Sequence, residues 1–322
     1  MSRLTIEQRR GFAIEGEHGV DACLSDGHGL VAQVGEDRLT TFRSAAKPFQ
    51  LETSLALLSP AQRVMLGTED LALGAASHHG EPTHVAHVRD LLSRLGRQPS
   101  DLFCGVHPPS DPASARALYA RGEEPTVLHN NCSGKHAFMA AACATRGFAP
   151  DYRAPEHPLQ RRVLDDLEAR TDGAVVGSVV DGCGVPCFVL PLSAMALAWG
   201  RLALAMREDS AADGLGAIGR AMLAHPRLMS GSHGFDGLLS EQSGVVAKVG
   251  AQGLLCVALP TRGLALALRA RSGSDAVRPQ AALALLARFA PEVVPEVVSP
   301  EFTAVFNLVG QRVGEIVARW ED

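Results

Sequence analysis

The sequence predicts an α/β protein of the α+β type, with an antiparallel sheet formed by strands from both ends of the chain. Residues 11–42 alternate short apolar and polar positions between glycines, and three apolar runs between residues 245 and 269 are spaced like the strands of a meander. The segment between them carries apolar residues at helical spacing. We therefore expect one discontinuous domain over residues 1–322, in which strand-rich segments 1–42 and 240–322 share a sheet and residues 43–239 are mostly a helical lobe.

The elements are expected in the following order. A hairpin or small meander over residues 11–42 precedes a buried helix that begins close to Ser44, because Pro48 is tolerated in a first helical turn but not deeper. Helical patterning continues over 69–95, with a break at 77–82. The other expected helices are 133–145, 158–170, 193–206, 213–223 and 278–289, and the other expected strands are 175–180, 186–190, 245–249, 254–259 and 264–269. A glycine-rich loop at 230–237 and a final apolar segment at 303–317 complete the chain.

Composition excludes several classes of protein. The 322 residues carry a formal net charge of -5, which gives no basic surface for nucleic acid. No apolar run approaches the roughly 20 residues of a membrane span, and the first seven residues are polar with an acid, unlike a signal peptide. The seven cysteines form an odd set without a regular framework, which favours a reducing compartment. We expect a cytoplasmic protein whose cysteines are thiols or metal ligands.

A serine and a lysine stand three residues apart at the start of the first predicted helix, in the string RSAAKPFQ at residues 43–50. Positions i and i+3 share a helical face, so the Ser44 hydroxyl and the Lys47 amine can meet there. The helix start also supplies backbone N–H groups that can stabilise an oxyanion. The pattern indicates an activated nucleophile, although an isolated match is also explained by a capping serine and a solvated lysine.

Two further residues could complete such a site. Ser77 lies in the helical break SHHGEP, and Lys248 lies within the apolar string VVAKVG at 245–250. A lysine in a buried strand costs free energy unless it is paired or its pKa is lowered. The alternatives are a helix cap for Ser77 and an edge-strand lysine that discourages aggregation. The histidines after Ser77 are expected as loop or supporting residues, because adjacent side chains rarely converge on one metal ion.

Five strings resemble the rhizobial-type, zinc-containing L-asparaginase family, also called asparaginase II. They are RSAAKPFQ at 43–50, ASH at 76–78, NCSGKH at 131–136, DGCGVP at 181–186 and KVG at 248–250. Their order and spread extend the resemblance to essentially the whole chain. The Ser-x-x-Lys and Lys-Val-Gly elements also resemble the serine β-lactamase and penicillin-binding-protein fold. The chain departs from the β-lactamase pattern, with Val249 in place of threonine and no clear Ser-Asp-Asn element.

The resemblance implies hydrolysis of L-asparagine to L-aspartate and ammonia, a β-lactamase-like fold and a homodimer. It also implies two Ser–Lys pairs, Ser44 with Lys47 and Ser77 with Lys248. Two lysines near each other disfavour each other's charge, so one could act as a neutral amine base at pH 7. That amine would take the proton of Ser44, which would attack the side-chain carboxamide. The roles of the two serines can also be exchanged.

The substrate needs further partners. Arg43 could hold the α-carboxylate through bidentate contacts, or form a surface salt bridge instead. Asn131 and His136 flank the most specific string and could contact the substrate or orient a ligand. Oxyanion stabilisation is expected from the backbone N–H of Ser44 and from the strand that ends at Gly250.

A zinc site is the cofactor prediction. Cys132 begins a predicted helix, where the pKa of a thiol is lowered, and Cys183 lies in a tight turn between predicted strands. Two such thiolates are plausible ligands of Zn²⁺. The resemblance adds Lys135 as the third ligand. Because the Ser–Lys residues can act without a Lewis acid, we expect the metal to tune substrate affinity and geometry more than it drives the chemistry.

Other function classes remain open at this point. A serine-dependent glutaminase, an esterase or a β-lactam hydrolase would use the same residues on the same fold. A non-catalytic amino-acid-binding protein would keep the Ser–Lys residues without turnover.

Overall fold

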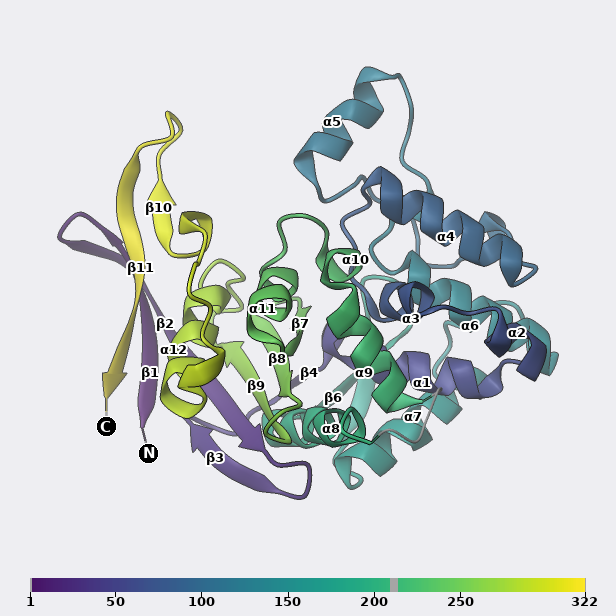
Figure 1. Ribbon diagram of the computed structural model, residues 1–322, viewed down its shortest axis with the longest axis horizontal. Helices are drawn as coiled ribbons and strands as arrows, with labels where there is room; N and C mark the ends of the chain where they lie inside the picture. The colour runs from purple at the N-terminus through teal and green to yellow at the C-terminus, as the bar shows by residue number, and fades with distance from the viewer. Residues whose placement is uncertain (1, 209–213, 322) are drawn as a thin grey trace. The chain divides into compact units, whose positions relative to one another are not determined.

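The computed structural model describes residues 2–208 and 214–321, which fold into two compact units (Figure 1). Unit 1 consists of Met1–Ala45, Leu190–Leu204 and Leu238–Asp322, and unit 2 of Ala46–Val189 and Ala205–Gly237. Each unit is therefore built from separate stretches of the chain. That the pieces make up a single discontinuous domain stays a prediction.

Unit 1 contains an eight-stranded sheet, counted over the described residues, in which strands from both ends of the chain are neighbours. Its order is β10-β11-β1-β2-β9-β8-β7, and β3 pairs with β2 beside this path. The pairings between β1, β2, β9 and β11 are antiparallel, with Leu4 opposite both Trp320 and Val20. The strands are β1 (Arg3–Arg10), β2 (Ala13–Ser25), β3 (Leu30–Val34), β7 (Val246–Gly250), β8 (Leu254–Leu259), β9 (Leu264–Ala270), β10 (Ala304–Phe306) and β11 (Arg312–Glu321). The predicted fold class is confirmed.

The sheet of unit 1 is covered by α12 (Arg278–Phe289), which packs against β1, β8, β9 and β11. Helix α8 (Leu192–Ala205) approaches the turn after β2 closely. A Cβ on Gly200 would lie 2.5 Å from the backbone nitrogen of Gly27, so the helix and the turn meet only because both positions lack a side chain.

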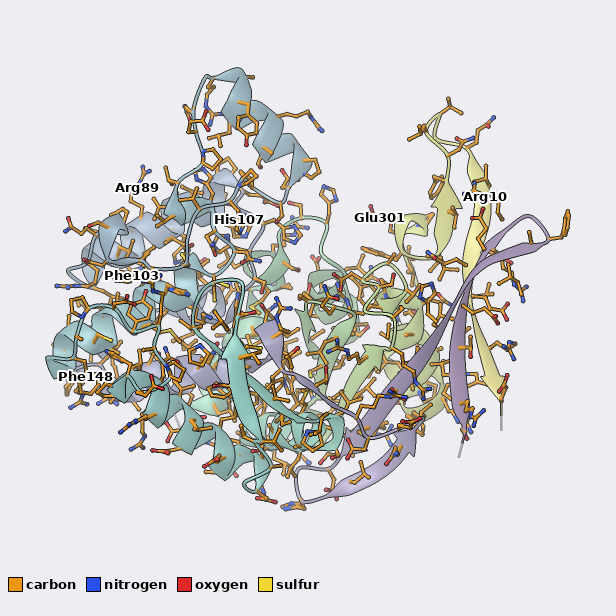
Figure 2. All side chains as sticks on the ribbon, turned by 180° about the vertical axis from the view of Figure 1, so that it is seen from behind. Arg10, Arg89, Phe103, His107, Phe148 and Glu301 are labelled. Atoms are coloured by element: carbon orange, nitrogen blue, oxygen red, sulfur yellow. The ribbon has the colours of Figure 1, made fainter. Side chains whose placement is uncertain are left out.

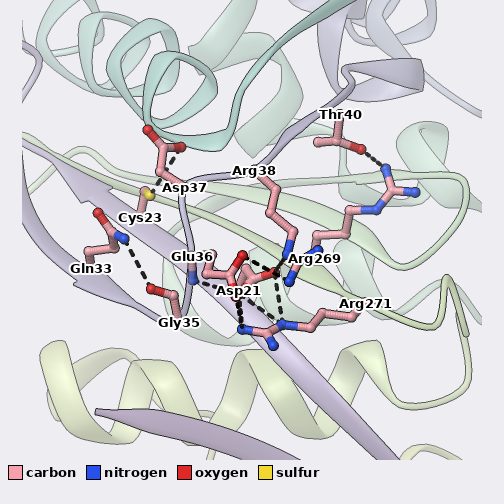
Figure 3. Close-up of polar contacts among 10 residues, drawn as sticks. All are labelled: Asp21, Cys23, Gln33, Gly35, Glu36, Asp37, Arg38, Thr40, Arg269 and Arg271. Atoms are coloured by element: carbon pink, nitrogen blue, oxygen red, sulfur yellow. Dashed lines mark hydrogen bonds and ion pairs between the residues drawn. The ribbon is translucent and has the colours of Figure 1, made fainter. Parts of the chain in front are cut away.

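A buried carboxylate in unit 1 holds the segment that leads from β3 to β4 (Leu39–Thr41) (Figure 3). Asp21 accepts hydrogen bonds from the backbone N–H of Glu36 at 2.7 Å and from the Arg271 guanidinium at 2.6 Å. Arg38 adds an ion pair to the same carboxylate at 3.0 Å. A buried carboxylate needs such charged partners. The cluster fixes the path of the chain shortly before Arg43 and Ser44.

Unit 2 is a helical lobe centred on α6 (Ser133–Arg146), whose residues from 133 to 143 are all buried. Helix α6 packs against α1 (Lys47–Leu57), α3 (Thr68–Ala75), α4 (Pro82–Arg94) and α7 (Pro158–Thr171). The remaining helices and strands are α2 (Pro60–Val64), α5 (Pro112–Ala120), α9 (Leu215–Ala224), α10 (Pro226–Ser230), α11 (Phe235–Ser243), β5 (Gly177–Val180) and β6 (Pro186–Pro191). Short 3-10 helices are Arg43–Ala46, Pro99–Asp101, Val127–His129, Pro291–Val293 and Pro300–Phe302. No helix in the described part of the chain combines the length and apolar character needed to cross a bilayer.

Most predicted elements are confirmed within a few residues, and two kinds of difference remain. The expected loop at 230–237 is shorter than predicted, because α10 ends at Ser230 and α11 begins at Phe235, so only residues 231–234 form the connection. Strand β1 and helices α2 and α5 were not predicted as separate elements. Asp213, where the helix 213–223 was expected to begin, lies outside the described residues.

Close packing of α3 against α6 predicts a strong effect of a single methyl group. A Cβ on Gly134 would lie 2.3 Å from the carbonyl oxygen of Leu73, a backbone atom that cannot rotate away. We expect Gly134→Ala to destabilise the protein by about 2 kcal/mol in urea unfolding, since overpacking outweighs the better helix propensity of alanine. Gly177→Ala is the control, because nothing lies within 4 Å of its added Cβ. Equal stabilities of the two variants would contradict the packing argument.

Candidate active site

Lys47 is the first residue of α1 and its amine is buried in unit 2. Its Nζ donates to the carbonyl oxygen of Ala76 at 2.5 Å and to that of Asn131 at 3.1 Å. Its third neighbour is the Ser77 hydroxyl, with an Nζ–Oγ distance of 2.9 Å. A charged ammonium would donate to all three oxygens. A neutral amine would donate to the two carbonyls and keep its lone pair for the serine proton.

Ser77 follows directly after α3, in the segment 76–81 that joins α3 to α4. Its backbone N–H donates to the carbonyl oxygen of Met229 at 3.1 Å, which ties this segment to α10. The backbone that carries the Ser77 hydroxyl is therefore fixed, and this hydroxyl lies within hydrogen-bond distance of the buried Lys47 amine. This is the arrangement that a base-activated serine requires.

Ser44 and Arg43 lie in the 3-10 helix Arg43–Ala46, which continues directly into α1. The helix start near Ser44 and the place of Pro48 in the first turn of α1 were predicted and are confirmed. The indole N–H of Trp199 donates to the carbonyl of Ala45 at 3.1 Å and fixes this turn within unit 1. Arg43 has a φ of 45°, a left-handed conformation that is costly for a residue with a side chain.

A second arginine of unit 1 faces Arg43. Arg269, on β9, donates a hydrogen bond to the Thr40 hydroxyl. Burial lowers the pKa of Arg269, and the charge of Arg43 lowers it further. The two arginines are therefore close enough for their positive charges to repel each other.

Lys248 is fully buried on β7, the last strand along the sheet path of unit 1. Its Nζ donates to the carbonyl of Val249 at 3.0 Å, and its strand neighbour across the sheet is Cys256. Gly250 ends the strand, and its added Cβ would lie 2.7 Å from the Leu254 side chain. Lys248 thus lies on an edge strand and is inaccessible to solvent, and both the functional interpretation and the role against aggregation stay predictions.

Two thiols and a lysine are buried together in unit 2. Cys132 is the N-cap residue of α6, Lys135 lies in its first turn, and Cys183 lies between β5 and β6. Lys135 Nζ donates to Cys183 Sγ at 3.2 Å, and Cys183 is hydrogen-bonded to Cys132. That bond lowers the pKa of Cys132 well below its ordinary value against the effect of burial, whereas the same bond and burial raise the pKa of Cys183. Burial opposes the charge of Lys135, but the two sulfurs outweigh it and raise its pKa. Cys132 therefore has the stronger thiolate character of the two cysteines, and Lys135 favours its charged form.

This donor set fits a borderline metal ion. Thiolate sulfur and amine nitrogen are ligand types that Zn²⁺ accepts, and an Asp181 carboxylate oxygen lies 3.6 Å from Cys183 Sγ. Among residues 2–208 and 214–321, no group of three or more His, Cys, Asp or Glu side chains could hold a metal ion. A metal here would therefore need Lys135 as a ligand.

Asn131 and His136 lie at the two ends of the string that contains Cys132 and Lys135. The backbone N–H of Asn131 donates at 2.9 Å to Nε2 of His107, which is labelled in Figure 2. His136 is fully buried and its Nδ1 lies 2.9 Å from the Tyr152 hydroxyl. Its Nε2 has no hydrogen-bond partner within the described part of the chain. Burial, with Lys135 and Lys47 adding to it, holds the pKa of His136 well below its ordinary value, so the ring is neutral.

The sequence model of the L-asparaginase II family matches residues 6–318. The chain belongs to the L-asparaginase II family. It is therefore an amidohydrolase that acts on a small-molecule substrate. No match was found among the curated proteins.

Solved structures are similar to this L-asparaginase II family member at low sequence identity. A β-lactamase from Mycobacterium bovis is 14% identical, with a TM-score of 0.45, over 84% of this chain and 94% of the other. The native form of a protein named Mglu is 15% identical, with a TM-score of 0.36, over 84% of this chain and 63% of the other.

Lysine usage is a signal that sequence reasoning missed. The chain has 27 arginines and only three lysines, Lys47, Lys135 and Lys248. All three are buried, at 1%, 2% and 0% relative exposure. Arginine supplies all the other permanently charged cationic side chains, whereas the amines of lysine occur only inside the protein. His78 and Ser133, which hydrogen-bond each other in unit 2, were also not identified as site residues.

Two buried histidines of unit 2 predict that stability falls in mild acid. Burial is the largest cause of the lowered pKa of His78, and the charges of His84 and Lys47 lower it further. Burial is also the largest cause of the lowered pKa of His84, where the nearby charge of Glu81 opposes it. In the unfolded chain the pKa of each histidine returns to about 6.5. At a pH between the folded and the unfolded pKa of a histidine, the unfolded state therefore binds more protons than the folded state. The free energy of unfolding should therefore rise with pH up to about 6.5, by at most about 1.4 kcal/mol per pH unit for each histidine.

Urea unfolding of wild type and His84→Gln between about pH 5 and about pH 7.5 measures this dependence. The variant should show a shallower slope below about pH 6.5. Identical slopes would show that His84 binds a proton equally well in both states.

Proposed function

We propose that the protein hydrolyses L-asparagine to L-aspartate and ammonia by serine–lysine nucleophilic catalysis. The observation that carries this proposal is the 2.9 Å contact between the Lys47 amine and the Ser77 hydroxyl, in a chain of the L-asparaginase II family. The family supplies the class of reaction, and the contact supplies a nucleophile and a base.

The chemistry follows from the contacts of Lys47. With two N–H groups held by the carbonyls of Ala76 and Asn131, a neutral amine presents its lone pair to the Ser77 hydroxyl. As the serine oxygen bonds to the side-chain carboxamide carbon, its proton passes to Nζ. The ammonium then returns a proton to the leaving nitrogen, the C–N bond breaks and ammonia departs. Water, deprotonated by the same amine, attacks the aspartyl ester, releases L-aspartate and restores the serine.

The proposed catalytic set also includes Ser44 and Lys248. Ser44 and Ser77 are both candidates for the nucleophile. Ser44 is supported by its place at a helix start, directly after a strained residue. Backbone N–H groups of Ser44 and of the strand ending at Gly250 are the proposed oxyanion donors. Arg43 is the proposed partner of the substrate α-carboxylate, since its guanidinium can bind a carboxylate bidentately.

The smaller roles proposed for Asn131 and His136 follow from their contacts. The Asn131 carbonyl accepts from Lys47, so this residue helps to orient the base. His136 has a buried ring nitrogen without a protein partner, which is suited to a water molecule or a polar atom of the substrate.

We also propose that Cys132, Lys135 and Cys183 bind Zn²⁺. The bound ion would supply a fixed positive charge that orders the neighbouring turn and tunes substrate affinity. The proposal is supported by the contact among these side chains and by the thiolate character of Cys132. The nucleophile and the base named above are the chain's own residues.

Location and assembly complete the proposal. All seven cysteines are buried and none forms a disulfide, which supports a reducing, cytoplasmic location. A homodimer is the proposed assembly, and light scattering coupled to size-exclusion chromatography tests it.

A time course of aspartate formation by the purified protein tests the function. We expect aspartate and ammonia in equal amounts from L-asparagine, with Lys47→Met as the inactive reference. L-Glutamine, nitrocefin and a short-chain ester run in parallel, and faster turnover of any of them would replace the proposed substrate. Tight binding of L-asparagine without ammonia would identify a binding protein instead.

A further inference from the structure

His78 follows the proposed nucleophile Ser77 and is fully buried. Its Nδ1 accepts from the backbone N–H of Gly80 at 3.1 Å, and its Nε2 lies 2.8 Å from the Ser133 hydroxyl. Because Nδ1 accepts, the proton of the neutral ring is on Nε2, which donates to Ser133. The Ser133 hydroxyl in turn donates to the carbonyl of Leu128 at 3.2 Å. Each hydrogen bond in this series of contacts therefore has a defined donor and a defined acceptor.

These contacts close a ring around the catalytic base. Lys47 bridges the Ser77 hydroxyl and the Asn131 carbonyl. One residue after Ser77 and two residues after Asn131, His78 and Ser133 bridge the same two segments a second time. The His78–Ser133 hydrogen bond therefore helps to hold the segment that carries Ser77 next to the segment that carries Asn131.

We propose that His78 is a positioning residue, which holds Ser77 against the N-terminus of α6 so that its hydroxyl stays within reach of the Lys47 amine. This inference rests on the proposed function for its kinetic consequences. It assigns to His78 no contact with substrate and no proton transfer.

The site is built for a neutral imidazole. A second ring proton on Nδ1 would face the N–H of Gly80, leaving two donors against each other. The ring also stacks on His84, with centroids 5.1 Å apart and planes inclined by 12°. The tight turn itself needs Gly80, whose φ is +70° and whose added Cβ would lie 2.9 Å from the His129 carbonyl. A longer or charged side chain at position 78 would not fit these contacts.

Amide substitutions separate the two ring nitrogens. In His78→Asn, the amide oxygen can replace Nδ1 and keep the contact with Gly80, but the side chain is too short to reach Ser133. In His78→Gln, the amide nitrogen can replace Nε2 and keep the contact with Ser133. We expect His78→Asn and Ser133→Ala each to lower kcat for L-asparagine about tenfold with KM changed less than about twofold, since a small misplacement of a nucleophile is costly. His78→Gln should keep kcat within about threefold of wild type. The double variant His78→Asn/Ser133→Ala should be no slower than either single variant, because each substitution removes the same His78–Ser133 hydrogen bond.

His84→Gln is the matched control, since His84 is buried and stacked on the same ring but bonds to the Arg227 carbonyl instead. It should lower stability and leave kcat within about twofold of wild type. A His78→Asn variant with wild-type kcat and a lowered Tm would show that His78 only fills space, and would overturn the inference.

A second measurement does not depend on turnover. Because the chain has only three lysines, protein labelled with ¹³C at lysine Cε gives three side-chain signals. The Lys47 signal should move in His78→Asn and in Ser133→Ala and stay in place in His84→Gln. An unmoved Lys47 signal in His78→Asn overturns the inference even if the wild type proves inactive on L-asparagine. Wild-type inactivity with the expected shifts would refute the proposed function alone.

Discussion

Replacing Lys47 with methionine should lower kcat for L-asparagine hydrolysis by about a hundredfold or more. The amine is buried and contacts the Ser77 hydroxyl at 2.9 Å, so its removal takes away the base that this contact supplies. Methionine keeps the length of the side chain and fills the same space, which separates loss of the base from loss of packing. Initial rates of aspartate formation, with folding checked by circular dichroism, measure the effect.

Double-mutant cycles decide which serine shares a step with this base. If Ser77 is the nucleophile, Lys47→Met/Ser77→Ala should be hardly slower than either single variant, because base and nucleophile act as one unit. The same cycle with Ser44→Ala should then give losses that multiply. The opposite pattern would identify Ser44 as the partner of Lys47. Multiplying losses in both cycles would remove Lys47 from the nucleophile-activating step.

The fold could be predicted wherever an element has a clear apolar pattern, either a helical spacing or an uninterrupted apolar run. Helix α12 begins and ends at the predicted residues, as does strand β8. The loop expected at 230–237 is shortened to 231–234, and the glycines give a physical cause. Added Cβ atoms on Gly234 and Gly237 would lie 2.3 and 2.6 Å from the Ser230 hydroxyl. These glycines allow close packing between α10 and α11, whereas sequence patterns alone suggest a flexible loop.

The candidate site was predicted as a set of motifs but not as a set of contacts. Spacing along one helix suggests that Lys47 meets Ser44, and this pairing stays a prediction. The contact with Ser77 arises because α1 packs against α3, which brings residues 30 positions apart within 2.9 Å. No local pattern reports such packing. The use of lysine at only three positions would have directed attention to the base without any structure.

Protein purified without chelator should contain up to about one Zn²⁺ per chain, and Cys132→Ser and Cys183→Ser should each lose it while remaining folded. In the metal-free cluster Cys183 holds its proton and Lys135 is an ammonium, because the pKa of each is raised. Binding must therefore release protons from both side chains. Zinc affinity should increase with pH, and the proton release is measurable by calorimetry in buffers of different ionisation enthalpy.

Cys143→Ser is the matched control for these variants. Cys143 is also a buried thiol on α6, and burial alone raises its pKa to about 12, so it should keep wild-type metal content. Loss of zinc from Cys132→Ser or Cys183→Ser should raise KM for L-asparagine more than it lowers kcat, since the proposed base and nucleophile do not depend on the metal. Wild-type stoichiometry in both variants would remove these cysteines from the metal site. Complete inactivation by a chelator, reversed by added zinc, would instead make the ion part of the catalytic step.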